Sequence, residues 1–507
     1  MFELVSSYKP AGDQPEAIQN ILKAFYASKN KLTLLGATWT WKTFTMANII
    51  KEISKPTLVI SHNKTLAAQL STEFKYFFPK NAVHYFVSYF DYYQPEAYLP
   101  EKDMYIEKDS AINKEIEMYR LSTMASLLSR QDVVVVSSVS ALYGIWSKEV
   151  FEKNMLVLEL WNTYDMKELK RKLLFMQYKP VQSKIESWMF DIRWEIVDIF
   201  SSVDKVIYRL YFNEDLLELI QIKDSVTYQD LWTVKKAVIW PWNQFLQDMS
   251  DLENIYEKIK SEMEERVKEL KSEWKELEAN RLQKRVMYDI RMIKETWFTN
   301  GIENYSLYFD RRMPGQPPNT LFDYFPDDFL LIIDESHMSL PQLRAMPNGD
   351  RSRKINLVKH GFRLPSAIDH RPLDFPELEY IMWWNKALNN PDDLKKDDEI
   401  DEIINKTLKP KKLDLSLIAD KLKKNAKTLF VSATPGEYEI NLSDQIFEQI
   451  IRPTGLLDPL TYVYPKDGDY DILTQSVDKL LKKKPYLEKY LLSYDEDVNL
   501  KELFLGS

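Results

Sequence analysis

The stretch LTLLGATWTWKTFTMANII, residues 32–50, decides the fold of this chain. An apolar run enters a polar turn and a helical pattern follows, which is the order of a phosphate-binding loop between a strand and a helix. Such a loop needs the pattern G-x-x-x-x-G-K-[ST], and here Trp41 stands at the second glycine place. From this spacing alone, an ordinary strand–turn–helix remains the alternative. The candidate phosphate-contacting residues are Gly36, Ala37, Thr38, Trp39, Thr40, Trp41, Lys42 and Thr43.

Length and composition are those of a multidomain globular protein. The 507 residues are enough for roughly two to four domains, and 45% of them are hydrophobic. The absence of cysteine excludes disulfides, thiolate metal sites and a cysteine nucleophile. No apolar run approaches the ~18 residues that cross a bilayer, and no export signal opens the chain, so we expect a cytoplasmic protein without membrane contact. The net charge of −9 still allows DNA binding through a local basic groove.

The order of apolar patterns along the chain predicts an α/β fold. Three short β-branched runs in residues 1–150, KLTLLG, PTLVIS and DVVVVSS, predict buried parallel strands, and TLAAQLSTEFKYFF predicts a helix between them. Alternating apolar residues over 157–250 predict the antiparallel strands of a small inserted α+β domain. The charged segment 251–295 predicts one long helix. The Lys/Asp-rich segment 385–425 predicts an exposed helical insertion.

A second motif, DFLLIIDESH at residues 328–337, strengthens the nucleotide-site interpretation. An apolar strand that delivers Asp334 and Glu335 suits phosphoryl transfer, with Asp334 holding Mg²⁺ and Glu335 polarising the attacking water. Two such motifs in this order make the joint interpretation much stronger than either alone. The VSAT segment, residues 431–434, ends another buried strand and could couple a nucleotide site to the position of bound DNA. Gln14 precedes the first strand, where an adenine-reading amide could lie.

The aromatic stretch SYFDYYQPEAYLPEKDMYIEKD, residues 88–109, predicts an extended hairpin. Its tyrosines do not alternate as in a strand that only packs in a core. Exposed tyrosines beside a basic groove are stacking platforms for unpaired bases, and the alternative is a packed aromatic edge strand. The basic segment 349–372 could contact phosphates or could be a solvated loop. The candidate DNA-binding residues are Tyr89, Tyr92, Tyr93, Tyr98, Arg351, Arg353 and Arg363.

Several phrases together closely resemble the UvrB family, the damage-verifying ATPases of bacterial nucleotide excision repair. The matching phrases span residues 1–460 in family order and are YKPAGDQPEAI, NKTLAAQL, SYFDYYQPEAYLPEKDMYIEKD, GIENYS, LFDYFPDDFLLIIDESH, GDRSRK, HGFRLPSAIDHRPL, VSATPG and QIIRPTGLLDP. The resemblance implies two RecA-like, P-loop helicase-type motor domains, a DNA-clamping β-hairpin and an inserted domain that contacts the damage sensor UvrA. It also implies ATP and Mg²⁺ as cofactors, and damaged duplex DNA, UvrA and the incising protein UvrC as partners.

Carried onto this sequence, the resemblance implies roles for the individual residues and segments. Lys42, Asp334 and Glu335 would be catalytic, Thr43 and Asp334 would hold Mg²⁺, and Gln14 would belong to the adenine site. Lys64 in NKTLAAQL joins the candidate DNA contacts. The expected domains are a first motor domain at 1–88, 110–156 and 251–440, the hairpin at 89–109, the UvrA-interacting insert at 157–250, and the start of a second motor domain at 441–507.

Tryptophan stands at many places where the family has glycine. Residues 39 and 41 are two of them, and Trp146, Trp194 and Trp297 are others; residues 161, 188 and 274 fall at or near family glycines. The chain has 11 Gly, about 2%, against a usual share of about 7%, and 13 Trp. The simplest hypothesis is that UGA codons read as glycine in the source organism were rendered as tryptophan. A true Trp41 would fill the space that a phosphate needs, so we would then expect a blocked pocket and negligible ATP turnover.

The expected second motor domain is largely missing, so that the chain resembles a fragment whose ATP hydrolysis would need the absent half. The expected function is damage verification, in which ATP binding and hydrolysis drive local strand separation while aromatic residues test for a lesion. Incision would belong to UvrC. One alternative is a general superfamily 2 DNA helicase or translocase. The other is a non-catalytic DNA- or UvrA-binding fragment.

Overall fold

The computed structural model describes residues 1–453 except 146, 177, 182–184, 186, 202, 204, 242–251, 297–298 and 384–420. All of them lie in the first of two compact units, Met1–Gly455. The expected helical insertion at 385–425 falls almost entirely outside the described residues, as do Trp146, Trp297 and the chain from residue 454 onward.

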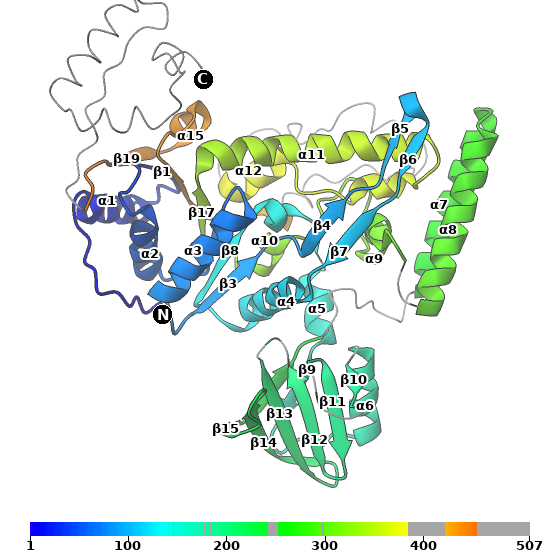
Figure 1. The fold of residues 1–507 in the computed structure, drawn as a ribbon, viewed down its shortest axis with the longest axis horizontal. Helices are drawn as coiled ribbons and strands as arrows, with labels where there is room; N and C mark the ends of the chain where they lie inside the picture. The colour runs from blue at the N-terminus through cyan, green and yellow to red at the C-terminus, as the bar shows by residue number, and fades with distance from the viewer. Residues whose placement is uncertain are drawn as a thin grey trace, which may run out of the picture. The chain divides into compact units, whose positions relative to one another are not determined.

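A seven-stranded, fully parallel sheet forms the centre of the described unit (Figure 1). Along β8, Val133 and Val135 pack into one hydrophobic cluster while Val134 and Val136 pack into another, because successive side chains point to opposite faces. A sheet buried on both faces needs continuous apolar strands, which explains the β-branched runs. The strands in spatial order are β19 (Gln445–Gln449), β1 (Lys31–Gly36), β18 (Lys427–Ser432), β17 (Leu330–Asp334), β2 (Thr57–Ile60), β8 (Val133–Ser137) and β3 (Ala82–Phe86).

Helices cover this sheet and confirm the α/β, helicase-type fold class. Asn63 caps α3 by accepting a hydrogen bond from the amide of Leu66, and Asn113 caps α4 in the same way. The larger helices around the sheet are α1 (Gln14–Tyr26), α2 (Lys42–Ile53), α3 (Lys64–Phe77), α4 (Lys114–Ser129) and α11 (Ser336–Lys359). The shorter connecting helices are η2 (Val139–Leu142), α5 (Lys148–Asn154), η4 (Ile302–Tyr305), α9 (Ser306–Phe309), α10 (Leu321–Tyr324), η5 (Pro365–Asp369), α12 (Phe375–Trp383) and α15 (Glu437–Leu442).

The predicted insertion is a second, mostly antiparallel sheet of six strands with one helix, α6 (Met166–Phe175). Apolar residues alternate along these strands, as in β12, where Val197 and Ile199 are buried. The strands run in the order β10 (Lys179–Pro180), β11 (Met189–Arg193), β12 (Ile196–Ser201), β13 (Val206–Asn213), β14 (Leu216–Asp224) and β15 (Asp230–Val234). A separate antiparallel pair consists of β9 (Leu156–Glu159) and β16 (Lys236–Ile239).

The aromatic stretch forms a hairpin in two antiparallel sections, as the sequence predicts. In the first section β4 (Phe90–Gln94) pairs with β7 (Asp109–Ile112), and in the second β5 (Ala97–Leu99) pairs with β6 (Met104–Ile106) (Figure 1). A short 3₁₀ helix, η1 (Pro100–Lys102), closes the tip. The last strand ends at Ile112, so that the paired region reaches beyond the expected end at residue 109.

The prediction of one long helix over 251–295 is wrong. Two helices occur instead, α7 (Leu252–Ser272) and α8 (Glu276–Thr296), and they pack side by side through the cluster that contains Val267 and Val286. The ion pair of Lys294 with Glu253 joins the end of α8 to the start of α7, so the two helices are antiparallel. The chain reverses at Trp274, whose backbone is left-handed with a φ of 60°.

The start expected for a second motor domain, at residue 441, differs from the structure. Residues 445–449 form β19, an edge strand of the first sheet, which pairs with β1 from Leu32↔Gln445 to Gly36↔Gln449. The parallel register places the end of β19 beside the phosphate loop, and the first compact unit continues to Gly455.

Candidate functional site

The candidate phosphate loop connects the end of β1 to the start of α2, as a nucleotide site requires. The Lys42 side chain folds back over Gly36, where a Cβ would lie 2.8 Å from the Lys42 Cγ and Cδ atoms. Only a glycine leaves room for the lysine in this position. The Lys42 ammonium donates to Glu335 Oε1 at 2.9 Å, so the loop reaches the second motif directly.

Asp334 and Glu335 end β17 and begin α11 on the same carboxyl edge of the sheet as the loop. Burial, and after it the charge of Glu335, raises the pKa of Asp334 to about 7, while the charge of Lys42 acts in the opposite direction. An acid that is disfavoured as an anion in this way would gain from a nearby cation. The described residues contain no group of three or more His, Cys, Asp or Glu side chains placed to hold a metal. Mg²⁺ needs no such cage, because it takes one or two carboxylates and completes its shell with water and phosphate oxygens. The Thr43 hydroxyl and the Asp334 carboxylate supply oxygen atoms of the kind that Mg²⁺ prefers.

A polar contact links the acidic motif to the VSAT segment at the end of β18. His337 Nδ1 lies 2.8 Å from Ser432 Oγ and 3.5 Å from Glu335 Oε2. Ser432 Oγ also accepts a hydrogen bond from the Thr434 amide at 3.0 Å. His337 therefore connects Glu335 to the end of β18.

Gln14 lies against the phosphate loop with both ends of its amide engaged. It donates to the Thr40 carbonyl at 3.0 Å and accepts from the Ala11 amide at 3.1 Å, and it is buried. Its adenine role stays a prediction, and its observed contact is with the loop itself. Nearby, Tyr8 packs edge-on against the Trp41 ring with centroids 5.2 Å apart.

The hairpin tyrosines divide into exposed and packed side chains. Tyr92 and Tyr93 on β4 are 51% and 46% exposed, and Tyr89 is half-buried. Tyr98, at 9% exposed, differs from the prediction of an open stacking platform, because it packs on Phe362 and donates to Asp103. The hairpin therefore offers two accessible rings near its base and a packed second section.

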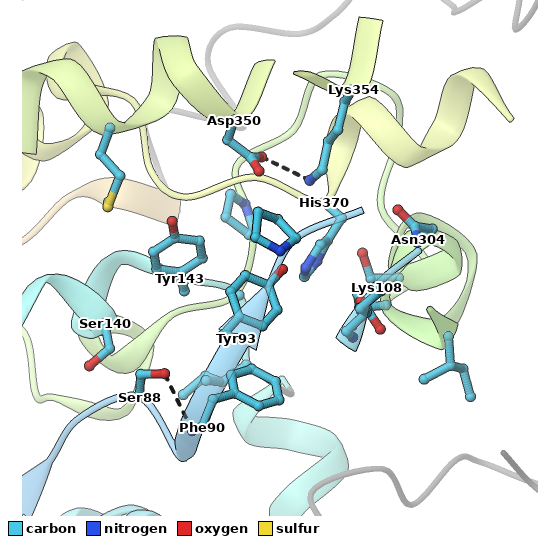
Figure 2. A pocket seen from close by; sticks show the side chains of 18 of the residues that line it. Ser88, Phe90, Tyr93, Lys108, Ser140, Tyr143, Asn304, Asp350, Lys354 and His370 are labelled. Atoms are coloured by element: carbon cyan, nitrogen blue, oxygen red, sulfur yellow. Dashed lines mark hydrogen bonds and ion pairs between the residues drawn. The ribbon is translucent and has the colours of Figure 1, made fainter. Parts of the chain in front are cut away.

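A cavity of about 600 Å³ lies under the hairpin. Figure 2 shows Tyr93 between Tyr143 and His370 at this cavity, with the ion pair of Asp350 and Lys354 above them. Burial, and next the charge of Lys354, lowers the pKa of His370 to about 3, so that its ring is neutral. Aromatic rings and paired buried charges together line this cavity.

The predicted basic DNA contacts are largely committed to the protein. Arg363 is 3% exposed and donates to Glu96 on the hairpin at 2.7 Å, so it does not face a solvent-borne phosphate. Arg353 donates to the Glu96 carbonyl at 2.6 Å, and Lys64 donates to the Phe90 carbonyl at 2.7 Å. Arg351 lies half-buried on α11. Most of these cations therefore fasten the hairpin to its surroundings.

Sequence reasoning did not single out several residues that surround the hairpin. Lys108 on the hairpin pairs with Glu303 at 2.5 Å. Burial acts to raise the pKa of Glu303, but nearby positive charge, that of Lys108 first, and hydrogen bonds together lower it to about 2. Lys354 belongs to the basic segment that was expected to contact phosphates; it is instead buried and pairs with Asp350 at 2.8 Å. The phrases GIENYS and GDRSRK contain or adjoin some of these positions, but the pairing across the chain has no local signal.

Comparison with known proteins gives matches to three family models. The UvrB interaction domain matches residues 156–245, the UvrB third helical domain matches residues 250–311, and the Type III restriction enzyme res subunit matches residues 7–157. These ranges correspond to the inserted sheet, the α7–α8 pair and the first strands of the parallel sheet.

Curated relatives resemble the chain over most of its length. UvrABC system protein B of Bacillus licheniformis is 42% identical over 516 residues, which cover 100% of this chain and 72% of the relative. The proteins of the same name from Bacillus subtilis and Caldanaerobacter subterraneus are 45% and 44% identical, over 93% and 95% of this chain and 65% and 66% of the relatives. The chain thus spans about two thirds of the length of these relatives. Within the described residues, no helix is both long and apolar enough to cross a membrane.

Proposed function

This chain belongs to the UvrB family, and we propose that it is the ATP-dependent damage-verifying component of bacterial nucleotide excision repair. One observation carries the ATP part of this proposal: Lys42 of the loop and Glu335 of the acidic motif, 293 residues apart in sequence, meet at the carboxyl edge of one parallel sheet. Nucleotides bind at this edge in open α/β sheets.

At this site each side chain has a separate task. Lys42 would give up its contact with Glu335 and bind the terminal phosphates. Thr43 and Asp334 would hold Mg²⁺, which neutralises phosphate charge when bound. Glu335, once released, would orient the attacking water. Because His337 contacts both Glu335 and Ser432, this release would be transmitted to β18.

The hairpin would test the DNA. Tyr92 and Tyr93 present exposed rings beside the cavity, and base–aromatic stacking is worth about 1–3 kcal/mol per base. The ion pairs of Glu96 with Arg363 and of Lys108 with Glu303 fix the hairpin, so that a strand passing beneath it would meet a rigid clamp. A bulky lesion would then be sensed as a failure to pass.

The remaining assignments rest on the family. The inserted sheet at residues 156–245 would contact UvrA, and DNA would pass to UvrC for incision. The proposed place of action is the cytoplasm.

A general superfamily 2 helicase or translocase is the second candidate, since a parallel-sheet motor alone would serve either function. The hairpin favours damage verification. Complementation of a bacterial strain that lacks its own UvrB protein, with this chain carrying W39G and W41G as the parent, separates the candidates. K42A should abolish the repair that the parent restores, and deletion of residues 90–112 should abolish damage-specific binding while leaving ATP binding. Unchanged repair by K42A would favour a non-catalytic binding fragment. Damage binding that survives the deletion would refute the clamp.

A further inference from the structure

Left-handed backbone conformations identify tryptophans that stand at glycine positions. Among the described residues, six of the fourteen non-glycine residues with a positive φ are tryptophan. A bulky L-residue rarely adopts this conformation, which glycine adopts freely. The fourteen residues are Ser28, Trp39, Trp41, Ser54, Asp103, Trp161, Trp188, Trp194, Lys205, Glu214, Tyr228, Trp274, Arg311 and Glu335.

We infer that the protein made in its own cell carries glycine at residues 39, 41, 161, 194 and 274, where UGA codons are decoded as glycine. These five tryptophans are also 75%, 41%, 67%, 97% and 92% exposed, although indole rings normally bury most of their surface. Two independent properties, backbone and exposure, therefore agree at each position. Trp188 and Trp232 each meet only one of the two conditions and are left out of the inference.

Trp274 gives the clearest case. Its amide donates to the Lys271 carbonyl at 3.1 Å, and the amide of Lys275 donates to the Leu270 carbonyl at 2.9 Å. These two bonds are those of the Schellman motif that ends a helix, in which the left-handed residue is usually glycine. Glycine at residue 274 is also a helix stop signal, which would predict the break between α7 and α8 from the sequence.

Trp194 is a second case of a turn that asks for glycine. It is the first residue of the two-residue loop between β11 and β12, where Arg193 pairs with Ile196. Trp194 has a φ of 53°, whereas Glu195 is not among the residues with a positive φ. In the hairpin turn with this pattern, glycine is preferred at the first position.

In the phosphate loop, residues 39 and 41 have φ values of 68° and 57°. Left-handed residues within such a loop turn successive amides toward one concavity, which binds anions. With glycine at both places the loop reads Gly-Ala-Thr-Gly-Thr-Gly-Lys-Thr and lets a phosphate approach the backbone. Three of the five positions lie outside this loop, so the inference does not depend on the proposed function.

Trp240 is the internal control. It is 5% exposed, lacks a positive φ, and stacks on Phe151 with centroids 5.4 Å apart and planes 13° from parallel. This ring belongs to the core, and its codon should be UGG.

Peptide mass spectrometry of the protein purified from its source organism tests the inference. We expect glycine at the five positions and tryptophan at 240; tryptophan at residues 39 and 41 would overturn it. A second measurement uses the recombinant chain with tryptophan at all of these positions. W274G should raise its midpoint of thermal unfolding, and W240G should lower it. A lower midpoint for W274G would contradict the assignment of that position. Neither measurement involves ATP, so failure here is distinct from failure of the proposed function.

A different observation supports a second proposal, which rests on the proposed function. We propose that Gln449, at the end of β19, is a positioning residue for the phosphate loop. Its side chain donates to the Thr40 carbonyl at 2.7 Å and accepts from the Thr45 hydroxyl at 2.8 Å, and its carbonyl accepts from the Ala37 amide at 3.0 Å. Gln449 is fully buried. One residue thus holds the loop at its beginning and middle and holds the first turn of α2.

The residues after Gln449 continue this support. Arg452 donates to the Thr38 carbonyl at 2.9 Å, and Asp13 accepts from the amides of Ile450 and Ile451 at 2.8 and 2.7 Å. Gln449 and Arg452 thus engage the loop carbonyls of Thr40 and Thr38, which holds the loop in one conformation. Gln449 touches no reacting atom, so its effect should appear in nucleotide affinity.

The test is titration of a fluorescent ATP analogue with Mg²⁺ into protein that carries W39G and W41G. At a temperature well below its unfolding midpoint, Q449M should raise the dissociation constant about tenfold. Q445M is the matched control, because Gln445 is exposed on the same strand and contacts Lys29 instead. Unchanged affinity in Q449M would overturn the proposal. If Q449M does not fold, T45V, which removes only the hydroxyl that Gln449 accepts from, serves in its place with the same two outcomes. Absence of binding by the parent protein would instead refute the proposed function.

Discussion

Lys42 and Glu335 form an ion pair of 2.9 Å between the phosphate loop and the acidic motif, and both side chains are mostly shielded from water. Each charge is neutralised by the other, so the site is stable without a nucleotide. A nucleotide phosphate would replace the Glu335 carboxylate as the partner of Lys42. Glu335 would then be available to orient the attacking water. We propose that this ion pair is the nucleotide-free state of the site.

The exposed hairpin tyrosines should contribute directly to DNA affinity. Replacing Tyr92 and Tyr93 by alanine removes two stacking surfaces, each worth about 1–3 kcal/mol. We expect at least a tenfold weaker affinity for a damaged duplex, measured by fluorescence anisotropy. Y26A is the control, because Tyr26 is 68% exposed on α1, away from the hairpin. Equal affinities for all three proteins would exclude stacking by these rings.

The Glu96–Arg363 ion pair should stabilise the hairpin in place. Both side chains are buried, and Arg363 also pairs with the buried Asp289 at 3.3 Å, so R363A removes a cationic partner from two carboxylates. Removal of one partner of a buried pair costs about 3–5 kcal/mol. Chemical denaturation should report a loss of this size. R193A is the control, since Arg193 is largely exposed and pairs with Asp191 at the surface of the insert. A loss for R363A no larger than that for R193A would contradict the structural role.

Glu262 should make stability depend on pH. It accepts hydrogen bonds from the Ser366 amide and the Tyr308 hydroxyl, both at 2.8 Å, and burial raises its pKa from 4.5 to about 7. Because the pKa is raised in the folded state, the contribution of this group is fully present below pH 4.5 and is lost as the pH rises through about 7.

The variant E262Q cannot titrate at this position. The difference in free energy of unfolding, E262Q minus wild type, should therefore increase by roughly 3 kcal/mol from acidic to mildly alkaline pH. Denaturation of both proteins at several pH values checks this. A constant difference across the range would show that Glu262 does not titrate in the folded state.

The parallel sheet and the meeting of the two motifs at its carboxyl edge could be predicted because their signals are local. A strand buried on both faces requires a continuous apolar run, and Asp334–Glu335 after such a run places two carboxylates at a known edge of the sheet. The parallel sheet confirms the fold class, and the comparisons with known proteins confirm the family.

Other features could not be read from the sequence because they depend on distant or hidden partners. Arg363 looks like a phosphate contact in a basic segment, but its carboxylate partner lies 267 residues earlier in the chain. The break between α7 and α8 has no signal in the sequence, because residue 274 is tryptophan and not glycine. The short strand β19 was assigned to a later domain because its place beside β1 is a tertiary contact.

Titration of Mg²⁺–ATP into protein that carries W39G and W41G tests the central claim most directly. The same titration into protein that carries W39G, W41G and K42A is the comparison. We expect saturable binding by the first protein and a loss of about a hundredfold in affinity in the second, because a charge-assisted contact to the phosphates is removed. Equal binding by the two proteins, or no binding by either, would contradict the proposed nucleotide site.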